Sequence, residues 1–473
     1  MKVCQLLFLS AIAASLAGCS VGPNYKAPVV PVPPQFANGA SQSYTTNATD
    51  ATWWLEFHDP ELNKLVTTAA ASNLDLRVAT ADLRAARASR LGARSDFFPA
   101  ANGVASYSNN KFSQAALFDA PVPLRTEELY EMGFDASWEL DIFGRVRREN
   151  EAANANVLAA VAVRRDVLVS LTSEVARNYF ELRGLQNELG VLRRNADNER
   201  ETLKITQARL DAGNGTDLDV ARARAQLENT LGEIPPAESG IAHAIHRLGV
   251  LTGQQPTALI TELGATAPIP ALPGLVAIGN PEQLLRRRAD IRAAERSLAA
   301  ATARIGVAVA DLFPRVTFNG NIDLQATSFS GLTGPASDTW SFGPTITWAA
   351  LDYGHVKSRI DAAGAGADAA LAQYEKTVLT ALEETENALV DFGRAQARSQ
   401  ALAESVNASE EAFNLAKARY NDGAADFLTV LDAERVLLEA EDQLAQTQTQ
   451  TATSLVAVYK ALGGGWEGEP HPK

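Results

Sequence analysis

The sequence predicts a mainly helical chain that also contributes β-strands to a membrane barrel. Three observations lead to this prediction: an internal duplication, two very long helical stretches without proline, and short segments in which apolar and polar residues alternate strictly. Alternation with a period of two indicates strands, and apolar spacings of three and four indicate helices. The expected fold class is therefore long antiparallel α-helical coiled coils plus four membrane strands per chain, built by duplication of one unit.

The duplication is visible as segments that return farther along the chain. Residues 96–99 return as residues 311–314, at a spacing of 215, and Gly213 returns as Gly423, at a spacing of 210. A repeat of this length is far longer than a solenoid repeat, so it indicates two copies of one structural unit.

Proline-rich stretches divide the chain into its expected parts. We expect a first repeat over residues 51–255, a linker with five prolines over 256–281, a second repeat over 282–462 and a C-terminal tail over 463–473. Each repeat should contain a helix, two barrel strands, a long helix, a turn and a return helix.

The N-terminus predicts export and lipidation. Residues 1–18 combine the positive Lys2 with an apolar stretch and small residues, as in a secretory signal peptide. They lead into the string Leu-Ala-Gly-Cys, which is similar to a bacterial lipobox, so we expect Cys19 to become the lipidated first residue of an extended tether over residues 19–50. Ser20, the residue that follows this cysteine, favours an outer-membrane location for the lipidated protein. The alternative is an ordinary signal with a chance cysteine.

Each repeat carries one rod-like helix and a tight reversal. A rod of roughly sixty-five residues is about 100 Å long at 1.5 Å per residue, which suits a coiled coil better than a globular domain. The expected helices cover residues 60–95, 146–210, 217–251, 355–420 and the stretch from the turn at 421–423 to about 462. The helix over 217–251 is expected to be interrupted at Pro235 and Pro236.

Four segments alternate between apolar and polar residues, and we expect each to be a strand. They cover residues 102–110, 130–142, 316–326 and 340–348. The clearest runs are longer than the usual globular strand, and Trp138 and Trp348 fall near strand ends, as in the aromatic girdles of membrane barrels. A soluble sandwich with one wet face is the alternative. No apolar run of eighteen residues occurs beyond the N-terminus, so no transmembrane helix is expected.

Four strands cannot close a barrel, and lipid does not tolerate open sheet edges. The barrel must therefore be shared: two subunits would give eight strands, and three would give twelve and an aqueous lumen. The charged residues expected to face this lumen are Glu131, Asp135, Glu139, Asp141 and Asp323, opposed by Arg315. This excess of carboxylates predicts a mild cation preference.

Composition and motifs exclude several classes of function. The chain has 42 basic and 56 acidic residues, a net charge of -14 that argues against a nucleic-acid partner. It has no nucleophile elbow, Walker loop or dinucleotide fingerprint, so we expect neither an enzyme nor a cofactor. His243 and His246 stand three apart, but no third ligand with suitable spacing accompanies them, so no metal site is expected.

The order of elements and several strings together resemble the TolC-like outer-membrane efflux proteins. These strings are residues 19–25 (CSVGPNY), 138–145 (WELDIFGR), 426–433 (DFLTVLDA) and 459–466 (YKALGGGW). The first is similar to the NodT/OprM-type lipoprotein branch. The resemblance covers essentially the whole mature chain.

The resemblance implies a homotrimer with a twelve-stranded barrel in the outer membrane of a Gram-negative bacterium. A helical tunnel would cross the periplasm and dock on a periplasmic adaptor (membrane fusion) protein and an inner-membrane RND-type transporter. Its acyl anchor would hold the protein in the lipid of the outer membrane. The solute would pass through the channel without any chemical reaction.

The resemblance also implies where the channel closes. Leu428 and Asp432 stand four apart on one helix face, where OprM-like members place an apolar ring and a carboxylate ring, and Arg435 can offset the carboxylates. An ordinary heptad leucine beside a solvated aspartate is the alternative. The candidates for adaptor docking are the turn residues Gly213, Asn214, Gly215, Asp422 and Gly423. These glycines could equally serve only the positive φ of a turn.

The expected function is the outer-membrane channel of a tripartite efflux pump, a passive gated conduit for drugs, toxic compounds or metals. One alternative is the exit duct of an ABC-type (type I) protein secretion system, which uses the same fold. Another is a structural coiled-coil envelope lipoprotein, which would need the alternating segments to be ordinary loops.

Overall fold

The computed structural model describes residues 20–39, 44–47, 50–111 and 126–466. The expected signal peptide, Cys19 and residues 467–473 of the expected tail lie outside this part. The chain forms two compact units. Among the described residues, the strand unit comprises those within 20–29, 82–161 and 293–374, and the helical unit comprises those within 30–81, 162–292 and 375–466.

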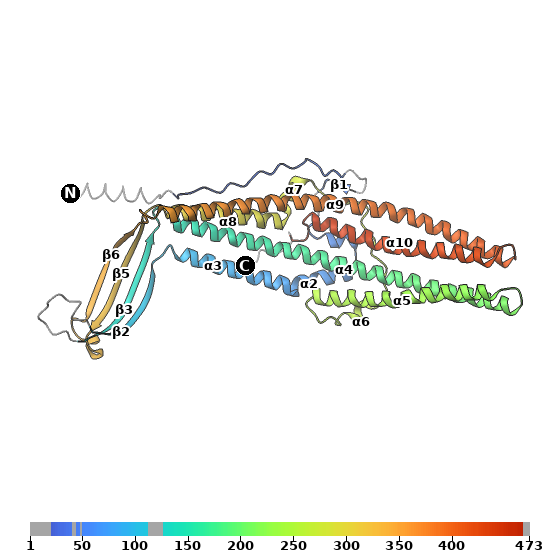
Figure 1. Cartoon of the computed structure of the whole chain (residues 1–473), viewed down its shortest axis with the longest axis horizontal. Helices are drawn as coiled ribbons and strands as arrows, with labels where there is room; N and C mark the ends of the chain where they lie inside the picture. Colours follow the sequence, from blue (N-terminus) through green and yellow to red (C-terminus); the bar gives the residue numbers. More distant parts are fainter. Residues whose placement is uncertain (1–19, 40–43, 48–49, 112–125, 467–473) are drawn as a thin grey trace. The chain divides into compact units, whose positions relative to one another are not determined.

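The strand unit contains one antiparallel sheet with the order β2-β3-β5-β6 (Figure 1). Its strands are β2 (Ala100–Asn110), β3 (Glu127–Leu140), β5 (Arg315–Ala326) and β6 (Asp338–Thr347). β3 of the first copy pairs with β5 of the second, so that Tyr130 lies opposite Ala326 and Leu140 opposite Val316. The four predicted strands are confirmed, and the two copies meet along the middle of the sheet.

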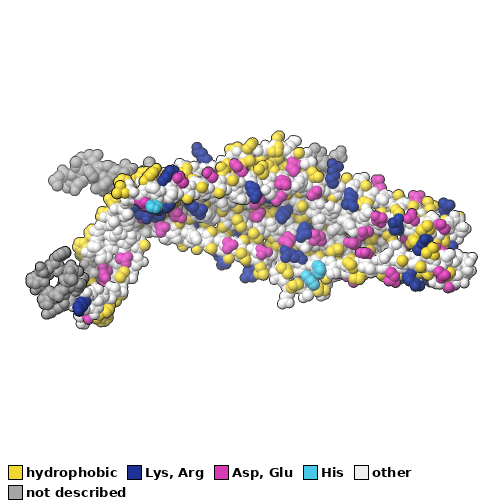
Figure 2. All heavy atoms as spheres, in the orientation of Figure 1, with side chains coloured by type: hydrophobic (Ala, Val, Ile, Leu, Met, Phe, Trp, Pro, Cys, Tyr) yellow, Lys and Arg dark blue, Asp and Glu magenta, His cyan; other side chains and the backbone are white. Residues whose placement is uncertain are grey.

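Two helical hairpins carry the long helices (Figure 1). α4 (Arg145–Asp211) is followed by α5 (Asp217–Leu251), and α9 (Tyr353–Asn421) is followed by α10 (Phe427–Ala461). Acidic and basic side chains are interspersed over these hairpins (Figure 2). This mixture is typical of solvated coiled-coil faces.

Aromatic packing closes the core of the helical unit. The ring of Trp53, in the short helix η1 (Trp53–Phe57), stacks on Tyr459 of α10 with ring centroids 4.8 Å apart. Both side chains are fully buried, and the Tyr459 hydroxyl donates to Glu56 at 2.5 Å. Burial of two large stacked aromatic rings is strongly stabilising, and the Tyr459 hydroxyl keeps a hydrogen-bond partner. The start of the folded body is thereby fastened to its last helix.

The shorter helices are α2 (Pro60–Ser72), α3 (Leu74–Ser95), α6 (Ile260–Leu263), α7 (Pro281–Arg287) and α8 (Ala289–Ala310). The expected single helix over 60–95 is divided at Asn73, whose backbone is extended. The Asn73 side chain donates to the carbonyl of Leu251 at 3.0 Å and accepts from the amide of Leu76 at 3.0 Å, so it begins α3 and fastens it to the end of α5.

The expected interruption at Pro235 and Pro236 is wrong, because α5 runs through both prolines. Each proline removes one backbone donor, which leaves a carbonyl one turn earlier without its helical partner. Both prolines and Gly232 are exposed and Leu231 is only half-buried, so water can reach the two freed carbonyls, which belong to Leu231 and Gly232.

The stretch expected to be an irregular linker contains short elements. β4 (Val276–Ala277) pairs in parallel with β1 (Tyr44–Thr45) of the N-terminal segment.

A 3-10 helix, η3 (Phe329–Thr333), follows β5 in the second copy. Among the described helices, none is both long and apolar enough to cross a membrane.

Candidate channel wall and periplasmic gate

The strand register gives the sheet one apolar face. Phe134 lies opposite Ile322, and Ile322 lies opposite Trp340, so these three side chains form a row across three strands. They are 69, 71 and 64 % exposed. The same face carries the exposed side chains of Met132, Trp138, Phe318, Leu324, Phe342 and Ile346. A continuous exposed apolar surface of this kind marks contact with lipid or protein, and lipid is its partner on the outside of a barrel.

The opposite face of the sheet is polar and carries the predicted strand charges. Glu131 accepts hydrogen bonds from Gln325 at 3.0 Å and from Ser106 at 3.2 Å. Asp135 accepts one from Asn102 at 3.2 Å. Both carboxylates are therefore held by neutral donors from neighbouring strands.

Asp323 lies on the same polar face but is buried. It is hydrogen-bonded to the side-chain amide of Asn321. The residue opposite it is Gly133, where a Cβ would lie 2.1 Å from an Asp323 carboxylate oxygen and 2.3 Å from the Ile322 carbonyl oxygen. The glycine provides the space in which this carboxylate lies.

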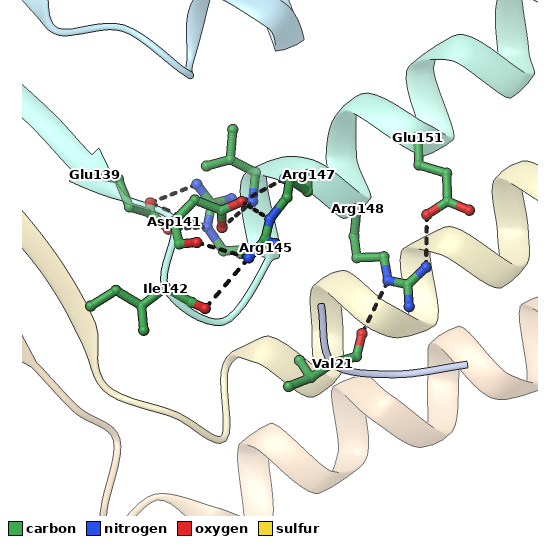
Figure 3. A network of polar contacts seen from close by, with 9 residues as sticks. Val21, Glu139, Asp141, Ile142, Arg145, Arg147, Arg148 and Glu151 are labelled. Carbon is green, nitrogen blue, oxygen red and sulfur yellow. Dashed lines mark hydrogen bonds and ion pairs between the residues drawn. The ribbon is translucent and has the colours of Figure 1, made fainter. Parts of the chain in front are cut away.

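An ionic network occupies the end of the sheet next to the helices. Glu139 binds Arg145 at 2.7 Å and lies 3.7 Å from Arg315, and Asp311 binds Arg315 at 3.3 Å and Arg359 at 3.2 Å. These five side chains line a cavity of about 370 Å³. Figure 3 shows Glu139 turned toward Arg145. The predicted lumen charge of Glu139 is therefore compensated, and Arg315 is shared between two carboxylates.

Asp141 is not a strand residue, in contrast to the prediction from the alternating pattern. β3 ends at Leu140, and Asp141 accepts hydrogen bonds from the amides of Val146 and Arg147, both at 3.0 Å. It also pairs with the Arg147 side chain at 3.0 Å (Figure 3). The first amides of a helix lack partners within the helix, so a carboxylate at this position caps α4. Its observed contacts are local to the start of α4, so it does not continue the strand as predicted.

The predicted gate residues lie on one exposed face at the start of α10. Leu428 is 49 % exposed, and the Asp432 and Arg435 side chains are 66 and 65 % exposed and form an ion pair of 3.1 Å. Leu428 and Asp432 line a groove of about 830 Å³ together with residues of α9. The opposite face of the same helix is buried through Phe427 and Val430. The predicted gate residues thus point away from the core of their own hairpin.

The first copy differs from the second at this position. Leu218, the counterpart of Leu428, is also exposed. The residue that precedes Asp432 by 210 positions is Arg222, so the carboxylate is replaced by a cation. The sequence itself carries the signal for this reversal of charge, because Arg222 follows Leu218 at the spacing at which Asp432 follows Leu428.

The two hairpin turns share one backbone geometry. Gly213 and Gly423 have φ values of 76° and 75°, and a Cβ on either would meet nothing within 4 Å, so the positive φ alone requires glycine here. The amide of Asn214 closes the first turn by donating to the Arg209 carbonyl at 2.8 Å. The amide of Ala424 makes the equivalent hydrogen bond in the second turn. At Gly215 a Cβ would lie 2.9 Å from the Leu210 amide, and Asp422 is exposed.

Two buried carboxylates close to the predicted gate residues were not predicted. Glu434 and Glu199 are 3 and 2 % exposed. Burial and the charge of Glu199 raise the pKa of Glu434 to about 7. Burial also raises the pKa of Glu199, which accepts hydrogen bonds from Thr230 at 2.9 Å and Gln226 at 3.1 Å. The apolar residues Phe427, Val430 and Leu437 bracket Glu434 at heptad spacing, which is the sequence signal that places it in the core.

The described residues hold no candidate metal centre. In residues 20–39, 44–47, 50–111 and 126–466, no three side chains of His, Cys, Asp or Glu come together as a metal site would need. The predicted lipidation site Cys19 lies outside these residues, although Ser20 and the segment after it are described.

A two-faced sheet of long strands, combined with helices far longer than a globular core needs, defines a channel protein of the outer membrane. The chain belongs to the outer membrane efflux protein family, whose model matches residues 65–254 and 280–464. The two matched stretches correspond to the two copies of the internal duplication.

Relatives of known name match along nearly the whole chain. Nodulation protein T of Rhizobium leguminosarum bv. viciae is 32 % identical over 451 residues, which cover 95 % of this chain and 92 % of the relative. The antibiotic efflux pump outer membrane protein ArpC of Pseudomonas putida is 33 % identical over 471 residues, covering 98 % of this chain and 96 % of ArpC.

Solved structures share the fold. The outer-membrane channel OprN has a TM-score of 0.90 and 43 % identity, covering 95 % of this chain and 100 % of OprN. The open state of the MtrE outer membrane channel of Neisseria gonorrhoeae has a TM-score of 0.83 and 30 % identity, covering 95 % of this chain and 99 % of MtrE. The TolC-like fold, the efflux function and the outer-membrane location predicted from the sequence are confirmed.

Proposed function

We propose that the chain is the gated outer-membrane conduit of a tripartite pump that exports small molecules. One observation carries this proposal: a sheet with an exposed apolar face lies in the same chain as helices of 67 and 69 residues. Its edge strands β2 and β6 have no further strand beside them in the described residues. Such a sheet needs both lipid and neighbouring strands, and such helices suit a wall that crosses an aqueous compartment.

In this proposal three chains close one barrel. Four strands from each give twelve, which leaves an aqueous lumen, whereas eight strands would leave an interior that side chains fill. The polar face, with Glu131 and Asp135, would line that lumen. Each chain also adds two helical hairpins, so three chains would supply six similar hairpins to the periplasmic wall.

The hairpin ends supply the proposed gate and the proposed docking site. Leu428 and Asp432 are exposed in the single chain, which suits side chains that meet their equivalents from other copies around an axis. The turns with Gly213, Asn214 and Gly215 and with Asp422 and Gly423 would contact a periplasmic adaptor protein. Through the adaptor the channel would serve an inner-membrane transporter of the RND class, and an acyl group on Cys19 would anchor it in lipid.

The exported compounds are proposed to be small and chemically diverse. Relatives are named for antibiotic, solvent and toluene efflux. These names support drugs or other toxic compounds as cargo for this chain. A structural coiled-coil lipoprotein would need the alternating segments to be loops, whereas they form one sheet.

Deletion of the gene, with susceptibility profiling against drugs, dyes, solvents and metals, tests the proposal. The expected result is increased susceptibility to a set of small compounds, reversed by the intact gene. Secreted proteins should be compared in the same strains. Loss of a secreted protein with unchanged susceptibility would overturn the proposal in favour of a type I secretion duct.

A further inference from the structure

The first described residues lie against the junction between β3 and α4. The amide of Val21 donates to the carbonyl of Phe143 at 3.2 Å. Arg148, in the first turn of α4, donates from Nε to the Val21 carbonyl at 3.1 Å and from Nη2 to the Gly22 carbonyl at 3.2 Å. Figure 3 shows the Arg148 side chain extended toward Val21. We call Phe143, Gly144, Arg148 and Gly306 the N-terminal cradle.

The Arg148 side chain forms most of its hydrogen bonds with this N-terminal segment. Its side chain is 3 % exposed, and its remaining bonds reach Asn24 Oδ1 at 2.7 Å and Glu151 at 2.7 Å. A buried guanidinium is costly unless its donors are satisfied. Here three of the four acceptors belong to residues 21–24. The fork of the guanidinium matches this arrangement, which a lysine could not reproduce.

Three glycines allow the close approach. Gly22 and Gly144 both have a φ of 84°, and Cβ atoms on them would lie 2.5 Å from Gly306 Cα and 2.7 Å from Ser20 Cα. A Cβ on Gly306 would lie 2.8 Å from Arg148 Cδ. The backbone of the segment and the surface of the cradle are therefore fitted to each other.

Farther along, a second contact holds the same segment. The Tyr25 hydroxyl donates to Glu295 of α8 at 2.5 Å, and Arg296 lies 5.7 Å from the centre of its ring. Lys26 and Ala27, which follow, are exposed. A tether that only kept the protein at a membrane would need none of these contacts, because a few extended residues suffice for that purpose.

We propose that Arg148 is a positioning residue that holds residues 20–24 in the N-terminal cradle and thereby fixes where the acyl anchor joins the protein body. Ser20 touches Gly144, which lies between the end of β3 at Leu140 and the start of α4 at Arg145. The anchor would therefore be attached at the level where the strands end. Its purpose rests on the proposed lipidation of Cys19, whereas the hold of Arg148 on residues 20–24 does not.

Digestion with trypsin tests directly whether Arg148 holds residues 20–24 in the cradle. Lys26 is the only lysine or arginine between Cys19 and Asn63, so cleavage after it separates the N-terminal peptide from the body in one step. Lys26 and Ala27 are exposed, but the residues just before them are held, so an increase in the cleavage rate reports an increase in the population in which the segment has left its site. The folded full-length channel in detergent is used, and cleavage is followed by mass spectrometry.

We expect Arg148→Gln to be cleaved at Lys26 at least about tenfold faster than the parent, and Arg148→Lys to be intermediate. Gly22→Ala should act in the same way, and it cannot disturb the folding of the body because it lies in the bound segment. Arg304→Gln, an exposed arginine of α8, is the matched control and should be cleaved at the parent rate. Equal rates for Arg148→Gln, Gly22→Ala and the parent would overturn the proposal.

The mass of the released peptide reports separately on lipidation. An acylated peptide that is released faster from the variants supports both ideas. An unmodified peptide would contradict lipidation, but the comparison of rates would still decide whether Arg148 holds the segment.

Discussion

Arg209 of α4 lies over the ring of Tyr420 of α9, with its guanidinium carbon 3.9 Å from the ring centroid. The same guanidinium donates to the carbonyl oxygens of Tyr420 at 3.1 Å and Asn421 at 3.4 Å. Asn421 is the last residue of α9, where carbonyl oxygens lack helical partners and carry partial negative charge. One arginine of the first copy therefore joins the end of its hairpin to the hairpin of the second copy.

Replacing Arg209 with alanine should loosen the hairpin ends and make the channel open more often. The variant loses a cation–π contact and two hydrogen bonds to a helix end, a loss on the order of 1–2 kcal/mol at a partly exposed site. Single-channel recordings in planar bilayers measure this as a larger open fraction. Arg200→Ala is the control, because Arg200 lies on the same helix and pairs with Asp197 one turn away. Identical single-channel recordings from the Arg209 and Arg200 variants would exclude a role of Arg209 in closing the channel.

Replacing Leu428 and Asp432 together with alanine should raise the conductance several-fold. The change removes an apolar side chain and a carboxyl side chain from the exposed face of α10, where we propose that copies meet around the axis. Leu218→Ala is the matched control in the first copy, where Arg222 stands in place of the carboxylate. We expect a smaller effect from this control. Unchanged conductance in the double variant would remove this face of α10 from the gating mechanism.

Ion selectivity should depend on Glu131 and Asp135 more than on the other strand carboxylates. Neutral donors hold these two, whereas Glu139 is paired with arginines. Glu131→Gln combined with Asp135→Asn should therefore reduce the cation preference in reversal-potential measurements. Glu139→Gln should also shift the potential toward anions, because it leaves Arg145 and Arg315 less compensated. A parent channel that prefers anions would contradict the assignment of this face to the lumen.

The sequence was sufficient for the parts of the fold that follow a simple period. Alternation located all four strands, and the same alternation separates Phe134 and Ile322 from Glu131 and Asp135 in the observed register. The predictions from sequence failed where contacts with a neighbouring element decide the local structure. Asp141 continues the alternating pattern, but the start of α4 takes its carboxylate as a cap.

The prolines of α5 and the buried Glu434 show two further limits. Pro235 and Pro236 are strong helix breakers in local sequence, yet they lie on an exposed face where water can replace the lost bonds. Glu434 occupies a core position by heptad spacing, but its charge suggests an exposed residue. Its burial depends on α4, which supplies Glu199 from more than two hundred residues away.

The stability of the helical hairpins should fall as pH rises, because of Glu434. Its pKa is about 7 in the folded chain against 4.5 for a free glutamate, so the folded state holds the proton more tightly than the unfolded state. The stabilisation is fully present below pH 4.5 and is lost as pH rises through about 7. Glu199 opposes ionisation of Glu434, and Lys417 partly favours it. A shift of this size corresponds to a loss on the order of 3 kcal/mol.

Glu434→Gln should therefore raise the thermal midpoint at pH 8 and change it little at pH 4.5, because the amide is nearly isosteric with the protonated acid and never ionises. Thermal unfolding of the assembled channel at several pH values measures this difference. Glu439→Gln on the exposed face of α10 is the control, and its pH profile should match that of the parent. If Glu434→Gln lowers the midpoint at pH 8, the ionised carboxylate is held by partners that outweigh its burial. α10 would then be fastened to α9 by a charge, because Lys417 of α9 is the cation that favours the ionised form.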